Sequence, residues 1–205
     1  MKIGMIVESL RRPLEEGIRR ARELGAEGIQ VYAVSRYLDM LNDPPGKLKM
    51  LKTLADDNGL TVSAVCSDLG GHGFSDPAGN LERLEKTRRI MEAARGFETK
   101  VLTTHIGVVP ADTASEHYAN VVGTLRQAGC DAQNNGMVLA IETGPESPEA
   151  LKQLLLDVDS KGIGVNMDPA NLAMVQNCDP AEAVRLLAPY ICLLYTSDAA
   201  DDSLR

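Results

Sequence analysis

Four side chains that can bind a metal or move a proton follow short apolar runs of the chain: His72, His105, Glu142 and Asp168. Glu142 shows the pattern most clearly, because it follows the apolar run 138–141 and precedes Gly144 and Pro145, which end a strand. A buried carboxylate is costly unless it is paired. This position therefore indicates a metal ligand, a proton-transfer group or a helix cap, and Ser147 is the better-placed cap.

Asp168 follows the apolar run 163–167 in the same way. Its sequence Asp-Pro-Ala-Asn also resembles Asp-Pro-Ala-Glu at 179–182, where a capping box predicts the start of a helix. Asp168 directly follows an apolar strand, whereas Asp179 follows a polar loop. This difference favours a metal ligand at Asp168, with a helix cap as the alternative.

The histidines each have two interpretations. His105 ends an apolar run and is either a substrate or metal contact or a hydrogen-bonded core histidine. His72 lies in the glycine-rich segment 70–73, whose glycines permit close approach to a ligand, although an ordinary flexible loop has the same composition. Glu8 and Glu146 could line the mouth of a site, but surface carboxylates are common and we assign them no role.

Six strand-like runs alternate with helical patterns, and no two strands are consecutive. The strands are predicted near 3–7, 29–33, 61–66, 100–104, 138–141 and 163–167. This alternation is typical of a parallel β/α architecture. No G-x-G-x-x-G follows the first strand, which weighs against a dinucleotide-binding sheet. Reactive residues at the carboxyl ends of several strands favour a barrel, where those ends form one face.

Size and composition set limits on the class of protein. The 205 residues, 44% of them hydrophobic, suffice for one sizeable core but fall short of the ~250 typical of a (β/α)₈ barrel. A net charge of −8 weighs against a nucleic-acid partner. The four cysteines lack C-x-x-C spacing, which indicates neither a zinc knuckle nor a disulfide framework. Without a signal peptide or a membrane-spanning run, we expect a cytoplasmic protein.

The end of the chain breaks the pattern. The run C-L-L-Y-T-S-D-A-A-D at 192–201 matches, codon by codon, the translation of a transposon-type sequencing adapter. We therefore expect 1–191 to be a partial barrel and 192–205 to be a non-native tail, with strands seven and eight missing. The alternative is a genuine strand over 191–195 followed by a polar tail.

Four phrases carry a resemblance to a known family. D-L-G-G-H-G-F, T-T-H-I-G-V-V-P, A-I-E-T-G-P-E and G-V-N-M-D-P-A-N-L resemble, in this order, the sugar phosphate isomerase/epimerase family of xylose isomerase-like TIM barrels. The resemblance implies an incomplete (β/α)₈ barrel with about six of eight β/α units. In that family a Glu after strand five, an Asp after strand six, a His after strand seven and a Glu after strand eight hold a divalent metal. The first two match Glu142 and Asp168; the others have no counterpart here.

The implied activity is a metal-dependent isomerase or epimerase of a sugar, polyol or sugar phosphate. Glu142 would be both metal ligand and proton-transfer group, acting through an enediolate, while Mn²⁺, Mg²⁺ or Co²⁺ polarises the carbonyl and zinc fits less well. His72, His105 and Asn171 would contact substrate. Asn171 stands where many family epimerases carry His, and Asn cannot shuttle a proton at neutral pH, so the substrate specificity need not be the same.

Two other classes remain open. A zinc phosphodiesterase of the endonuclease-IV type, in which histidines after early strands bind further zinc ions, would need more than the three histidines present and a basic face. A non-catalytic fragment is the third class, because half of the ligand set is missing and an open barrel exposes strand edges. We expect little or no activity from this chain. The parent's partner would be a small sugar, with neither nucleic acid nor membrane, and the full-length parent could be a homo-oligomer.

Overall fold

The structure is a computed structural model that describes residues 2–71, 73–176 and 178–194. Its centre is a sheet of seven parallel strands that lie side by side in the order of the sequence. The strands are β1 (Gly4–Ile6), β2 (Gly28–Tyr32), β3 (Thr61–Cys66), β4 (Val101–Thr104), β5 (Val138–Glu142), β6 (Ile163–Met167) and β7 (Ile191–Leu194). Consecutive parallel strands require a crossover between each pair, and helices provide it here.

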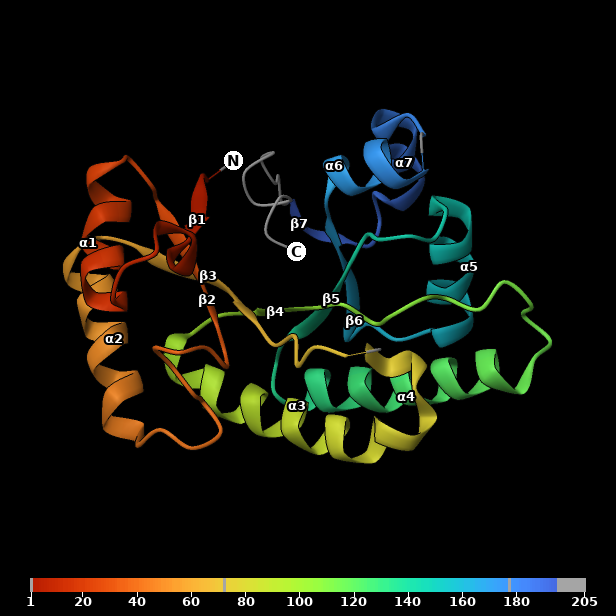
Figure 1. Ribbon diagram of the computed structural model, residues 1–205, viewed down its shortest axis with the longest axis horizontal. Helices are drawn as coiled ribbons and strands as arrows, with labels where there is room; N and C mark the ends of the chain where they lie inside the picture. The colour runs from red at the N-terminus through yellow and green to blue at the C-terminus, as the bar shows by residue number, and fades with distance from the viewer. Residues whose placement is uncertain (1, 72, 177, 195–205) are drawn as a thin grey trace.

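The helices lie on the outer side of the curved sheet, from α1 and α2 at one end to α5 and α7 at the other (Figure 1). They are α1 (Leu14–Glu23), α2 (Pro45–Asp57), α3 (Asn80–Ala94), α4 (Glu116–Asn134), α5 (Pro148–Val158), the single turn α6 (Pro169–Asn171) and α7 (Pro180–Leu187). No helix in the described part of the chain is both long and apolar enough to cross a membrane.

These elements confirm the predicted parallel β/α architecture, and the sheet is an incomplete TIM barrel. The six predicted strands coincide with β1 to β6 to within a few residues. The sequence did not predict α6 or the π-helical turn Leu172–Gln176 that follows it. Both lie directly after Asp168, so this residue opens a helical segment as well as ending a strand.

The expectation that strand seven is missing was wrong: the structure has β7 at Ile191–Leu194, within the strand over 191–195 that was the alternative. Residues Ile191–Leu194 pair in parallel with β6, and Val165 lies opposite Ile191. The short apolar run explains the pairing, since any such run can add to a free parallel edge. The adapter origin of the segment stays a prediction, and residues 195–205 lie outside the described residues.

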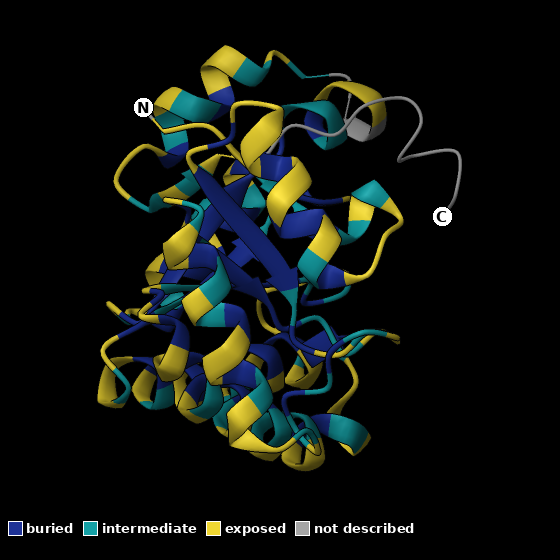
Figure 2. Cartoon of the chain, turned by 90° about the vertical axis from the view of Figure 1, so that its left-hand side faces the viewer, coloured by how far each residue is buried: buried dark blue, intermediate teal, exposed yellow. Residues whose placement is uncertain are grey.

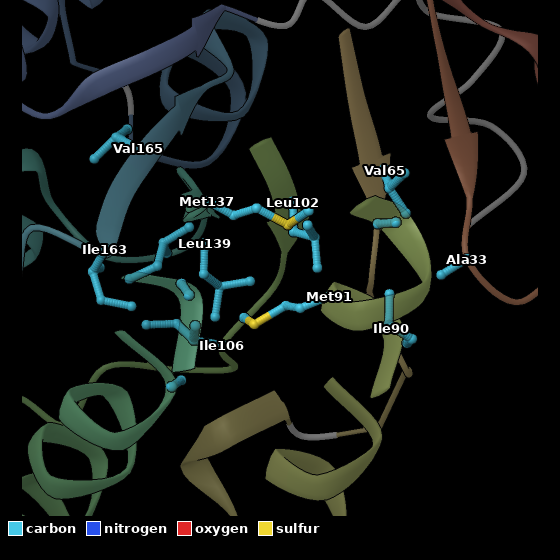
Figure 3. Packing of buried hydrophobic residues seen from close by; sticks show 14 of the residues in the cluster. Ala33, Val65, Ile90, Met91, Leu102, Ile106, Met137, Leu139, Ile163 and Val165 are labelled. Atoms are coloured by element: carbon cyan, nitrogen blue, oxygen red, sulfur yellow. The ribbon is translucent and has the colours of Figure 1, made fainter. Parts of the chain in front are cut away.

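The core fills the space between the sheet and its outer helices. Leu102 of β4, Leu139 of β5 and Met91 of α3 point toward one another there (Figure 3), and all three are fully buried. The inner strands β2 to β6 are mostly buried, whereas the edge strands β1 and β7 are only partly buried. The helices bury mainly their inner faces and expose their outer faces (Figure 2). Burial of both faces of the inner strands explains why these strands read as apolar runs rather than as alternating patterns. Such a core holds the strand ends rigidly in place.

Candidate active site

A pocket of about 340 Å³ lies at the carboxyl ends of the strands, where a β/α barrel builds its active site. Several strands contribute to its wall. Its polar lining includes Gln30 of β2, Cys66 of β3, Asp68 just after β3, His105 after β4, Glu142 of β5 and Asn166 of β6. The pocket therefore combines two carboxylates with an imidazole, a thiol and two amides.

Glu142 is held by three nitrogen atoms. Its Oε1 lies 3.2 Å from His105 Nε2 and accepts a hydrogen bond from Asn171 Nδ2 at 3.4 Å. Its Oε2 accepts one from Asn166 Nδ2 at 3.3 Å. The Glu142 side chain is only 10% exposed, and all three contacts are long for hydrogen bonds. Three nitrogen atoms from three different residues thus orient the Glu142 carboxylate within the pocket.

His105 lies between two carboxylates. Its Nδ1 is 2.8 Å from Asp68 Oδ2, while its Nε2 faces Glu142. The hydrogen bonds to Asp68 and then to Glu142 raise the pKa of His105 to about 10, although burial acts in the opposite direction. Because the two carboxylates favour an imidazolium, His105 presents a donor rather than an acceptor to Glu142.

Asp168 is buried directly after β6 and caps α6. Its Oδ1 accepts hydrogen bonds from Ala170 N at 2.8 Å and Asn171 N at 3.4 Å. Thr143 Oγ1 joins it to the strand that carries Glu142, accepting from Asp168 N at 2.8 Å and donating to Asp168 O at 3.1 Å. The helix cap that the sequence left open is therefore present. Ligation of a metal by Asp168 stays a prediction.

The remaining predicted substrate contacts divide into two groups. Asn171 reaches the site, because its Nδ2 donates to Thr143 O at 2.9 Å as well as to Glu142. His72 lies outside the described residues, so the structure adds nothing to its prediction. The structure thus brings together His105, Glu142 and Asn171 directly and connects Asp168 to them through Thr143.

The pocket lining also includes residues that were not singled out from the sequence, among them Gln30, Cys66, Asp68 and Asn166. Gln30 and Asn166 are 8% and 1% exposed. The signal for these two is a polar amide inside a buried apolar strand, which is unfavourable unless the amide has a partner. Gln30 Nε2 donates to Thr103 Oγ1 at 3.1 Å. Burial raises the pKa of Cys66 to about 11, so this pocket residue is a neutral thiol.

Two further carboxylates near these strand ends are less exposed than expected for surface residues. Glu146 is 8% exposed, and burial raises its pKa, although its Oε1 accepts a hydrogen bond from Gly144 N at 3.2 Å. Burial also raises the pKa of Glu8, whose Oε1 accepts from Tyr32 N at 2.9 Å. Glu8 Oε2 is buried and has no hydrogen-bond partner among the described residues.

Replacing Glu8 with glutamine is expected to stabilise the fold by about 1 kcal/mol at pH 7 to 8, since it removes a charge from an incompletely paired site. The folded pKa of Glu8 lies above its usual 4.5. Wild-type stability should therefore fall as pH rises through the folded pKa, and the gain from the variant should vanish below the unfolded pKa. Urea unfolding of both proteins, measured from below pH 4.5 up to pH 8, tests the expectation.

The exposed Glu16, whose ion pair with Arg12 spans 3.8 Å, provides the control. Its change to glutamine should alter stability little at any of these pH values. A Glu8→Gln protein that is less stable than wild type at pH 8 would show that the Glu8 carboxylate is well paired in solution.

The fit of a divalent metal can be judged from the oxygen donors. No group of three His, Cys, Asp or Glu side chains in the described part of the chain is arranged to hold a metal. Glu142 and Asp168 nevertheless lie at the ends of the adjacent strands β5 and β6, and Asp68 lines the same pocket as Glu142. Mg²⁺ and similar hard ions are commonly bound by one or two carboxylates together with water and substrate. The two carboxylates fit part of such a site.

Fold and pocket together define a β/α-barrel protein with its site at the carboxyl ends of the strands. The chain matches the xylose isomerase-like TIM barrel family over residues 18–204, and it belongs to that family. An uncharacterized protein of Methanocaldococcus jannaschii is 29% identical over 160 residues, which are 70% of this chain and 52% of that protein. The chain thus spans about half the length of this curated relative.

Two solved structures show the same fold at low sequence identity. D-psicose 3-epimerase, crystallised in the presence of D-fructose, superposes with a TM-score of 0.80 at 16% identity, over 97% of this chain and 74% of that one. A xylose isomerase-like TIM barrel protein of Mycobacterium smegmatis in complex with magnesium has a TM-score of 0.74 at 17% identity, over 95% and 74%. These similarities establish the architecture.

Proposed function

We propose that this chain carries part of the active site of a metal-dependent sugar isomerase or epimerase, and that Glu142 transfers the proton. The observation that carries the proposal is the position of Glu142, at the end of β5, in the pocket and beside His105. A carboxylate so placed can remove a proton from the carbon next to a carbonyl and return it through an enediolate. His105 and Asn171 would contact substrate hydroxyl groups.

The neutral part of the pocket suits a polyhydroxyl compound. Gln30 and Asn166 contribute amides and Cys66 a thiol that burial keeps protonated. Amides both donate and accept hydrogen bonds, as sugar hydroxyls do. The similarity to D-psicose 3-epimerase supports a sugar as substrate.

Glu142 and Asp168 would hold the divalent metal, and Mn²⁺, Mg²⁺ or Co²⁺ suits their carboxylate oxygens. The bound ion would polarise the substrate carbonyl and so make the adjacent carbon more acidic. The magnesium in the related Mycobacterium smegmatis barrel supports this choice of ion. The residues of this chain then orient the substrate and move the proton.

Deuterium exchange tests the function directly. The 205-residue chain is incubated with Mn²⁺ in D₂O with a ketohexose, with its phosphate ester, and separately with Zn²⁺ and DNA that contains an abasic site. We expect at most slow entry of deuterium into the carbon beside the carbonyl, because two of the four metal ligands that the family resemblance implies have no counterpart in this chain. Cleavage of DNA without exchange would favour a zinc phosphodiesterase. If the chain catalysed neither reaction, the result would favour a non-catalytic chain.

Metal binding is tested by replacing Asp168 with asparagine. If Asp168 is a ligand, Mn²⁺ affinity measured by calorimetry should fall at least about tenfold, because an amide oxygen carries no charge. Asp179 is the matched control, since its Oδ1 caps α7 by accepting from Ala181 N at 2.9 Å, much as Asp168 caps α6. Asparagine is also a good cap, so both variants should stay folded. Equal Mn²⁺ affinities in the two variants would remove Asp168 from the ligand set.

A further inference from the structure

Asp68 has both carboxylate oxygens engaged at the pocket wall. Its Oδ1 accepts a hydrogen bond from Gly70 N at 2.9 Å, which closes a tight turn after β3. Its Oδ2 lies 2.8 Å from His105 Nδ1. Although burial alone would raise the pKa of Asp68, the hydrogen bonds from His105 and Gly70 lower it. Asp68 is therefore a fixed anion with one oxygen committed to the His105 ring.

The turn that carries Asp68 is itself anchored to neighbouring elements. Ser67 N and Ser67 Oγ both donate to Thr103 O of β4, at 2.8 and 3.0 Å. Arg83 of α3 donates from Nη2 to Gly70 O at 2.9 Å. These bonds hold the backbone on both sides of Asp68 without involving Glu142. The position of Asp68 thus does not depend on Glu142.

This anchoring determines how the His105 ring lies. A carboxylate can only accept, so the bond to Asp68 requires a proton on Nδ1 and leaves Nε2 facing Glu142 at 3.2 Å. The partner of one imidazole nitrogen sets the role of the other. The Asp68–His105 bond is shorter than the His105–Glu142 contact, which indicates that Asp68 rather than Glu142 orients the ring.

We propose that Asp68 is a positioning residue: it fixes the His105 ring so that Nε2 holds the Glu142 carboxylate in one orientation within the pocket. This inference rests on the proposed function for its catalytic consequence, because the orientation of Glu142 matters only where Glu142 transfers a proton. The arrangement itself can be tested without turnover.

The first test observes the ring nitrogens by NMR in the full chain labelled with ¹⁵N-histidine, without metal or substrate. The chain has three histidines, so a His105→Gln variant assigns the signals. We expect a His105 ring proton whose exchange with water becomes at least tenfold faster in Asp68→Ala. Asp68→Asn keeps the size but loses the charge, and should shift both ring nitrogen signals. If Asp68→Ala fails to fold, Asp68→Asn decides alone.

The control is Asp157→Asn, because Asp157 also accepts one strong hydrogen bond, from Tyr118 Oη at 2.7 Å, but lies on the outer helix α5. It should leave the His105 signals unchanged. Glu142→Gln should move the Nε2 signal and leave the protected Nδ1 proton in place. Unchanged His105 signals in the Asp68 variants would overturn the proposal, as would loss of the Nδ1 proton in Glu142→Gln.

The second test uses deuterium exchange of the ketohexose. Asp68→Asn should lower kcat by about 10- to 100-fold, the range found for residues that orient metal-binding side chains, with KM changed by less than about twofold. A raised KM with unchanged kcat would mean that Asp68 contacts the substrate, and would overturn the proposal. If the wild-type chain catalyses no exchange, kcat cannot be compared, and the NMR result alone decides the role of Asp68.

Discussion

Replacement of Glu142 by glutamine is expected to slow the exchange of ketose hydrogen with solvent by about 100- to 10,000-fold, the usual contribution of a general base. Glutamine has nearly the same shape, and its amide oxygen can still accept from His105 Nε2, 3.2 Å away in the wild-type protein. It cannot accept the substrate proton. Because the uncharged amide would also bind the metal more weakly, the two proteins are compared at saturating Mn²⁺. The loss should then fall on kcat, and the rate is measured by NMR of the sugar in D₂O.

Glu149→Gln is the matched control, because Glu149 is an exposed glutamate on the helix that follows the same strand. It should change the exchange rate by less than about twofold. Comparable thermal unfolding of the two variants would show that the fold is not the cause. If Glu142→Gln exchanged hydrogen as fast as wild type, Glu142 would not be the proton-transfer group, and the proposed mechanism would have to be abandoned.

The position of Glu142 could be predicted because it depends on local signals. Val138, Leu139 and Ile141 have the side chains that a strand buried on both faces prefers, and Gly144 and Pro145 end that strand. In a parallel β/α fold the carboxyl ends of the strands share one face. A residue that ends such a strand can therefore be assigned to the site from the sequence alone.

The position of Asp168 could be predicted, but its role could not be separated from that of a cap. The same Asp-Pro-Ala sequence caps α7 at Asp179, and the structure shows equivalent bonds at Asp168. The distinguishing feature is tertiary, because Asp168 is 1% exposed beside Thr143, whereas Asp179 lies at the surface. Local sequence carries the capping chemistry and says little about burial.

Asp68 was missed for a different reason. Its partner His105 is 37 residues further along the chain and on the next strand unit. Nothing local distinguishes Asp68 from other aspartates in loops, since an Asp followed two residues later by Gly is also a common turn. The amides of Gln30 and Asn166 could have been noticed as polar residues inside apolar strands. The contact between Asp68 and His105 required the three-dimensional arrangement of β3 and β4.

A substitution in the glycine-rich loop beside Asp68 is expected to lower the stability of the protein strongly. Gly73 has φ +58°, and a Cβ atom there would lie 2.3 Å from Ile106 C and 2.6 Å from Gly107 N, directly after His105. Alanine in this left-handed conformation costs about 1–2 kcal/mol, and forced overpacking adds about 1–3 kcal/mol. We expect Gly73→Ala to lower the free energy of unfolding by about 2–5 kcal/mol, measured by urea denaturation.

Gly70→Ala separates the two contributions, because Gly70 has φ +71° in the same loop but a Cβ atom there would meet nothing within 4 Å. It should cost only the backbone strain, about 1–2 kcal/mol. The difference between the variants then measures how tightly this loop packs against the backbone that carries His105. Gly73→Ala should also change the NMR signals of the His105 ring more than Gly70→Ala does. Equal losses of stability would mean that the loop rearranges easily around the added methyl group. The packing of this loop would then not fix the position of Asp68 relative to His105.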